Sequence, residues 1–233
     1  MSSGSLDLKS MLQAAATLSE EVVFEKLIEK LLLLSIENAG AQNAWLLMNR
    51  KEGLCVEACS AMANEFTCEI APVPLEQVDD IAHSMVRKVR QTAEAVILDD
   101  ARHDPVYGHD PQLKNAQARS VLCMPILSKG QVSAILYMDN RSASNVFTPA
   151  RLEVLRLLSA QMAVSLENAL LYQQLEQKVE ERTATIATQK AEIEREKQKA
   201  DALLRNILPE EVAGELKENG FSRPRKYDEV TIM

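Results

Sequence analysis

Residues 120–138 read SVLCMPILSKGQVSAILYM and consist of two apolar runs separated by a short polar turn. The runs are Ser120–Leu127 and Val132–Met138, and the turn between them contains Gly130. Two β-prone runs joined by a few residues that include a glycine are typical of a β-hairpin. Pro125 lacks a backbone N–H and therefore predicts an edge position or a β-bulge within the first strand. The stretch thus indicates an antiparallel sheet.

A second hairpin is predicted nearer the N-terminus. Residues 44–48 form a continuous apolar run, Asn49–Gly53 supply a polar turn, and residues 54–58, apolar except for Glu57, follow as the second strand. Between the two hairpins, Ala95–Leu98 reads as a short strand. These segments extend the predicted antiparallel sheet.

Asp79–Arg90 is predicted to form a helix beside that sheet. Its apolar residues recur on one helical face, with acidic residues at its start and basic residues at its end, as the helix dipole favours. The stretch from Asp99 to Arg119 contains two Asp-Pro steps and predicts a long irregular segment. Long irregular segments inside compact domains are often functional.

Helices are expected at both ends of the chain. The segment Leu6–Asn38 is amphipathic and predicts one long helix or two short ones. Thr148 is a suitable helix cap, Pro149 suits the first helical position, and no glycine or proline follows until Pro209. A helix of some 60 residues would measure about 90 Å at 1.5 Å per residue, so we expect it to extend beyond the domain.

The second half of that helix carries a seven-residue apolar repeat, typical of a coiled coil. The repeat consists of Tyr172, Val179, Ile186, Ile193, Ala200 and Ile207. A coiled coil needs a second apolar row, which here would start three residues after Tyr172 and consist of Leu175, Arg182, Gln189, Glu196 and Leu203. Only the two end members of that row are apolar, which predicts a seam that is weak in its middle. We expect a parallel homodimer formed through the N- and C-terminal helices, with a solvated single helix as the alternative.

Composition narrows the function classes. The net charge of −8 and the 4% aromatic content argue against nucleic-acid binding. No stretch reaches the roughly 20 apolar residues of a membrane span, and the N-terminus lacks signal-peptide features, which predicts a cytoplasmic protein without membrane contact. The four cysteines show no C-x-x-C spacing, so we expect reduced thiols.

Several motifs, in order and spacing, resemble the GAF domain, a sensory module. They are Val96–Ala101, Asp104-Pro105, Arg119–Ile126, Gly130–Asn140, Phe147–Pro149 and Ser165–Ala169. The resemblance implies an α+β fold, a central antiparallel sheet with flanking helices, followed here by a long C-terminal coiled-coil helix. In this organisation, residues 1–38 form N-terminal helices of a dimer bundle and residues 23–171 form the GAF domain. Residues 172–208 then form a signalling helix, and residues 209–233 begin an output domain.

The C-terminal segment resembles the entry into a class III adenylate or guanylate cyclase domain. The resemblance rests on Leu203–Pro209 and on Tyr227–Ile232. It implies a parent protein that converts ATP to cAMP and pyrophosphate with Mg²⁺ or Mn²⁺. The metal-binding aspartates of that family would lie beyond Met233, so we expect this chain to be non-catalytic and to hold no metal. Asp228 and Glu229 are adjacent and would point to opposite faces of a strand, which disfavours a catalytic carboxylate pair.

In GAF domains a ligand pocket lies between the sheet and the irregular segment that covers it. On this resemblance the candidate ligand-binding residues are Asp100, His103, Tyr107, His109, Cys123 and Tyr137. Asn140-Arg141 and Phe147 lie near the places of a cyclic-nucleotide signature, but Arg151-Leu152 replace its Asp-Glu pair, which disfavours cyclic-nucleotide binding. The absence of a Cys-His dipeptide disfavours a bilin. Four alternatives remain open for this pocket. It could bind an unidentified small molecule, or it could be closed. The two histidines could simply lie in solvent, and Cys55, Cys59 or Cys123 could act as a redox sensor.

One main function and two alternatives are therefore expected. The first is a sensor that regulates an adenylate cyclase through the coiled coil. The alternatives are a ligand-free dimerisation scaffold and the GAF-linker region of a histidine kinase.

Overall fold

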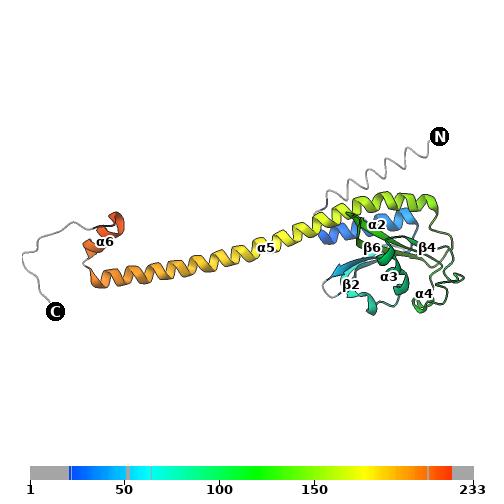
Figure 1. The fold of residues 1–233 in the computed structure, drawn as a ribbon, viewed down its shortest axis with the longest axis horizontal. Helices are drawn as coiled ribbons and strands as arrows, with labels where there is room; N and C mark the ends of the chain where they lie inside the picture. Colours follow the sequence, from blue (N-terminus) through cyan, green and yellow to red (C-terminus); the bar gives the residue numbers. More distant parts are fainter. Residues whose placement is uncertain (1–20, 22, 51–52, 64, 209, 222–233) are drawn as a thin grey trace, which may run out of the picture. The chain divides into compact units, whose positions relative to one another are not determined.

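A computed structural model describes residues 21, 23–50, 53–63, 65–208 and 210–221 (Figure 1). They fall into two compact units, residues 1–174 and 175–233. The expected helix before residue 21 lies outside the described residues, as does the cyclase-like segment from residue 222, with Asp228 and Glu229.

The first unit contains a six-stranded sheet in the order β3-β2-β1-β6-β5-β4, in which every neighbouring pair is antiparallel. The strands are β1 (Asn43–Arg50), β2 (Gly53–Met62), β3 (Phe66–Pro74), β4 (Val96–Leu98), β5 (Ser120–Ser128) and β6 (Gln131–Asn140). The helices are α2 (Phe24–Ala39), α3 (His83–Thr92), α4 (Pro111–Ala116), α5 (Pro149–Ile207) and α6 (Glu210–Asn219), with a 3₁₀ turn η1 at Leu75–Gln77. The predicted α+β fold with a central antiparallel sheet is confirmed.

The β5–β6 hairpin forms where the sequence predicts it. Lys129 and Gly130 both adopt positive φ angles, 52° and 78°, as a tight two-residue hairpin turn requires. Pro125 lies beyond the last pair of β4 with β5, where β5 has no strand neighbour on that side, as expected for a proline at an edge position. The register shifts between Ile126 and Leu127, which is the expected bulge.

The sheet separates two apolar layers. On one face, alternate side chains such as Leu122 and Leu136 pack with α2 and with the first part of α5. On the other face, residues such as Trp45 and Ile135 pack with α3 and α4. Figure 1 shows this sandwich, with α2 and α5 on one side and α3 and α4 on the other. Period-two alternation along the strands supplies both faces.

The ends of α2 and α5 are tied together around Gly40. Gly40 ends α2 in the left-handed conformation, with φ 68°. The Arg151 guanidinium donates from Nη1 to the carbonyl of Ala39 (3.1 Å) and to the carbonyl of Val146 (2.9 Å). An added Cβ at Gly40 would lie 2.5 Å from that nitrogen. The junction therefore depends on glycine for both its backbone angle and its space.

The structure corrects three predicted elements. Helix α3 begins at His83 rather than Asp79, because the two aspartates lie in the turn that precedes it. Strand β3 was not predicted, since it is an edge strand with no fully buried position and with prolines near its end. The irregular segment contains the short helix α4, whose N-cap Asp110 accepts from the backbone N–H of Gln112 and precedes a proline.

Helix α5 has two distinct parts. Its first part buries one face against the sheet, at Leu152, Leu155, Leu158, Met162, Leu166 and Ala169. From Leu171 to Ala200 every residue is exposed, including the predicted seam residues Tyr172, Val179, Ile186 and Ile193. Within Pro149–Leu204 the helix also meets the length and composition of a membrane span, a test that core helices pass as well.

Candidate functional site

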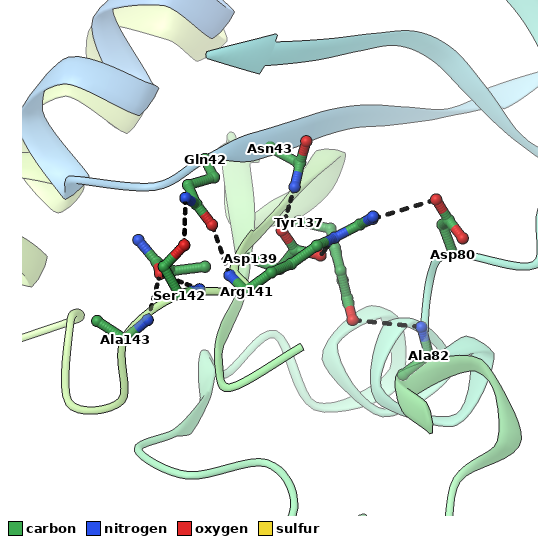
Figure 2. Close-up of polar contacts among 10 residues, drawn as sticks. Gln42, Asn43, Asp80, Ala82, Tyr137, Asp139, Arg141, Ser142 and Ala143 are labelled. Atoms are coloured by element: carbon green, nitrogen blue, oxygen red, sulfur yellow. Dashed lines mark hydrogen bonds and ion pairs between the residues drawn. The ribbon is translucent and has the colours of Figure 1, made fainter. Parts of the chain in front are cut away.

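A polar network lies at the end of β6, where Arg141 follows the strand (Figure 2). The Arg141 guanidinium donates from Nε to Oδ2 of Asp139 (3.2 Å) and from Nη2 to Oδ2 of Asp80 (3.1 Å). The other oxygen of Asp139 accepts from Nδ2 of Asn43 at 2.6 Å. Strands β1 and β6 are neighbours in register here, so Asn43 and Asp139 face each other. Arg141 thus joins the sheet to the turn that precedes α3.

The network holds a fully buried carboxylate. The Asp139 side chain is 0% exposed, and its burial raises the pKa of that carboxyl, against the opposing effect of the Asn43 and Arg141 donors. Partial burial opposes the charge on Arg141, but Asp139 and Asp80 outweigh it and raise the pKa of the guanidinium. Arg141 is therefore a fixed cation at this end of the sheet.

The backbone around Arg141 is fixed by side-chain amides. Oε1 of Gln42 accepts from the backbone N–H of Arg141 at 2.7 Å, and Nε2 of Gln42 donates to Oγ of Ser142 at 2.7 Å. Oδ1 of Asn140 accepts from the backbone N–H groups of Ser142 (3.0 Å) and Ala143 (2.8 Å). Asn140 and Arg141, which the sequence places near a cyclic-nucleotide signature, here build the turn after β6.

A cavity of about 390 Å³ opens on one side of Arg141. It is lined by Ala101, Arg102, Gly108, Leu113, Lys114, Gln117, Ala118, Arg119 and Arg141. Four of these nine residues are cationic and none is acidic, in a chain whose net charge is −8. We call this the cationic cavity.

A second cavity, of about 320 Å³, lies along the β1–β3 end of the sheet and also reaches Arg141. Its lining includes Trp45, Cys59, Glu69 and Asp80. This lining is mixed in charge, in contrast to that of the cationic cavity. Arg141 therefore borders two cavities of different character.

Asp100 and His103, two of the predicted ligand residues, bind each other. Nδ1 of His103 lies 3.0 Å from Oδ2 of Asp100, and the Arg102 guanidinium donates to both oxygens of Asp100 at 3.1 Å. The Arg102 and His103 contacts hold the pKa of the Asp100 carboxyl well below its usual range. The pair sits on the irregular segment beside the cationic cavity but does not line it.

The other four predicted ligand residues do not converge on a cavity. Cys123 and Tyr137 pair across β5 and β6 and are both fully buried in the core. Tyr137 Oη accepts from the backbone N–H of Ala82 at 3.4 Å, and its ring packs edge-on against Trp45 at 5.6 Å. Tyr107 is buried in the same core layer, whereas His109 is exposed. None of the six predicted residues lines the cavities described above.

The cationic residues Arg102, Lys114, Arg119 and Arg141 were not among the six predicted ligand residues. A signal was present, because three of the four lie within the irregular segment of a strongly acidic chain. Within the part of the chain that the structure describes, no group of three or more His, Cys, Asp or Glu side chains is arranged to hold a metal ion.

Comparisons with known proteins place these features in a family. The GAF domain model matches residues 24–166, and the model described as "Heme NO binding associated" matches residues 157–216. The GAF domain of Acinetobacter phosphoenolpyruvate-protein phosphotransferase has the same fold, with a TM-score of 0.51 and 16% identity over 71% of this chain and 95% of that one.

Two curated relatives are histidine kinases. Hybrid signal transduction histidine kinase G of Dictyostelium discoideum is 34% identical over 89 residues, 38% of this chain and 3% of that protein. Peroxide stress-activated histidine kinase mak3 of Schizosaccharomyces pombe is 22% identical over 187 residues, 79% of this chain and 8% of that protein. The chain thus spans less than a tenth of either relative. Since the GAF model covers well over half of its residues, the chain belongs to the GAF domain family.

Proposed function

We propose that the chain is the sensory and dimerisation region of a larger cytoplasmic signalling protein, in which the GAF domain controls an output domain through α5. The observation that carries the proposal is the exposed apolar row on α5. The residues of that row repeat every seven positions, and Ile186 and Ile193 are 63% and 67% exposed. Large aliphatic side chains left in water at heptad spacing are stabilised when a second helix covers them.

The partner proposed for this row is a second copy of the chain. Identical helices in parallel register bring each row residue against its own counterpart, so the repeat is self-complementary. The domain-packed part of α5 also exposes apolar residues at seven-residue spacing, namely Leu157, Val164 and Leu171. A continuous parallel pair would couple the packed part of α5 in the two copies to their output domains.

A histidine kinase output is the candidate that the relatives favour. Both curated relatives named above are histidine kinases, and both are matched by a small part of their length. In this candidate α5 and α6 lead from the sensor towards a kinase.

A class III adenylate cyclase output is the second candidate. It is supported by the resemblance of Leu203–Pro209 and Tyr227–Ile232 to the entry into a cyclase domain. None of the relatives or solved structures named above is a cyclase. In this candidate the parent protein would convert ATP to cAMP and pyrophosphate with Mg²⁺ or Mn²⁺, and the catalytic groups would lie outside this chain.

The dimer is tested by measuring the mass of the chain by light scattering after gel filtration. Wild type is expected at twice 25.9 kDa. Ile186→Asp places a charge in the row and is expected to shift the chain towards monomer. Ala184→Asp is the matched control, since residue 184 lies two positions away, outside both rows, and is also exposed. Equal masses for the two variants would contradict the proposed seam.

The output is tested on the full-length parent protein. Incubation with ATP is expected to give either cAMP or a phosphohistidine, and each product selects one candidate. Formation of neither product, with a dimeric chain, would leave the ligand-free scaffold as the function.

A further inference from the structure

We infer that the cationic cavity binds a small phosphorylated organic molecule through Arg102, Lys114, Arg119 and Arg141. The inference rests on the proposed sensor function and names the class of ligand that the sensor takes. Guanidinium groups bind phosphate and carboxylate oxygens in pairs, and a lysine adds a point charge. Four such groups around one cavity favour an anionic occupant.

The charges of this lining are only partly compensated. Arg102 is paired with Asp100, and Arg141 with Asp139 and Asp80. Within the described residues, neither Lys114 nor Arg119 forms an ion pair, and Arg119 donates from Nη1 only to the carbonyl of Ser142 at 2.9 Å. Two cations without a carboxylate partner therefore face a cavity that contains no acidic side chain.

Arg119 stands on a fixed backbone. Its carbonyl accepts from the N–H of Ala101 (2.7 Å), and its own N–H donates to the carbonyl of Asn140 (2.9 Å). These two bonds join the irregular segment, β5 and the end of β6 beside the cavity. A fixed backbone lowers the cost of ordering the arginine when a ligand binds.

The α4 side of the cavity is held as well. Asp110 caps α4, and its Oδ2 accepts from Oγ of Ser84 on α3 at 2.7 Å. Gln117 ends α4 in the left-handed conformation, with φ 53°. Lys114 is therefore presented from a short helix whose first turn is tied to α3.

The cavity is larger than a bare phosphate ion requires. Its volume of about 390 Å³ and its apolar members Ala101, Leu113 and Ala118 leave room for an uncharged body attached to the anionic group. Gly108 allows the backbone of the wall to pack closely on itself, because a Cβ there would lie 2.5 Å from the carbonyl oxygen of Asp104.

Binding is tested by calorimetry on the purified chain at low ionic strength. The probes are inorganic phosphate and 5′-AMP, with adenosine as the uncharged counterpart of 5′-AMP. Wild type is expected to bind 5′-AMP and phosphate, with affinity falling as salt rises, and to bind adenosine at least about tenfold more weakly than 5′-AMP.

Substitutions locate the site. Lys114→Gln and Arg119→Gln are each expected to weaken 5′-AMP binding about tenfold. Lys88→Gln and Arg90→Gln remove the same charges from the exposed side of α3 and are expected to leave binding unchanged. Equal effects of the cavity and control variants would overturn the inference, as would equal affinity for adenosine and 5′-AMP. Failure of phosphate and 5′-AMP to bind at about 10 mM would overturn it too.

The mass of each variant separates this inference from the proposed function. A dimer that does not bind the anions would overturn the anion site alone. A monomer that binds them would overturn the proposed dimer and leave the anion site standing.

Discussion

Nη2 of Arg141 lies 3.1 Å from Oδ2 of Asp80, a residue 61 positions earlier in the chain. The contact connects the end of the central strand β6 with the turn before α3 and places a cation between two cavities. The same guanidinium is the charged partner of the buried Asp139. Arg141 therefore stabilises the sheet and also contributes a positive charge to the cationic cavity.

Replacement of Arg141 by glutamine is expected to lower the free energy of unfolding by about 2 kcal/mol at pH 7, because it strips a buried carboxylate of its charged partner. The cost stays below that of a fully buried pair since the Arg141 side chain is 36% exposed and water can reach the site. Urea denaturation measures the loss. Asp80→Asn keeps the Arg141–Asp139 contact and is expected to cost less than about 1 kcal/mol.

The Arg141→Gln variant should also respond to pH in a defined direction. Burial already raises the pKa of Asp139, and loss of the arginine raises it further. A folded-state pKa above the unfolded value means that the folded state holds the proton more tightly, so stability falls as pH rises between the two values. The deficit of the variant is therefore expected to shrink from pH 7 to pH 4. A deficit that grows on acidification would contradict this assignment.

Replacement of Gly40 by alanine is expected to lower the free energy of unfolding by about 1–3 kcal/mol. Alanine disfavours the left-handed backbone angle of this position, and its Cβ would lie 2.5 Å from the Arg151 guanidinium. Thermal unfolding followed by circular dichroism measures the effect. Gly130→Ala is the control for backbone angle alone, because Gly130 has a positive φ and no atom within 4 Å of the added Cβ. Equal losses would show that the Arg151 contact contributes nothing.

Alkaline pH is expected to destabilise the fold through the buried thiol of Cys123 and the half-buried thiol of Cys68. Burial raises the pKa of Cys123 and raises that of Cys68 to about 11, from an ordinary value of 9.0. The unfolded chain then ionises first, and stability is lost as pH rises above about 9. Urea denaturation at pH 8 and pH 10 measures the slope, and Cys123→Ala is expected to reduce it. An unchanged slope in that variant would contradict the role of this thiol.

Local pattern predicted the strands and helices whose signals are strong. The turn residues Lys129 and Gly130 mark the β5–β6 hairpin, and Pro149 marks the start of α5, because backbone angles and capping act over a few residues. Edge strand β3 alternates Phe66, Cys68 and Ile70 with polar residues, but this run is short and is followed by Pro72 and Pro74. It owes its conformation to pairing with β2, a contact that local pattern does not encode.

The candidate site was predicted only in part. The predicted irregular segment supplies most of the lining of the cationic cavity. Cys123 and Tyr137, predicted to bind a ligand, lie on the face of the sheet that α3 and α4 cover, and apolar residues of these helices fill the space above them. The approach of Arg141 to Asp80 depends on packing between segments distant in sequence, so the residue types and their spacing did not reveal it.

The most direct measurement of the proposed dimer is disulfide formation by Ile186→Cys under mild oxidation, read as mass on a non-reducing gel. In a parallel pair in register, the two copies of residue 186 face each other within reach of a disulfide. The proposed dimer predicts a covalent species of twice 25.9 kDa for Ile186→Cys, and none for wild type or for Ala184→Cys. Absence of that species for Ile186→Cys, or equal yields from the two variants, would contradict a parallel seam on α5.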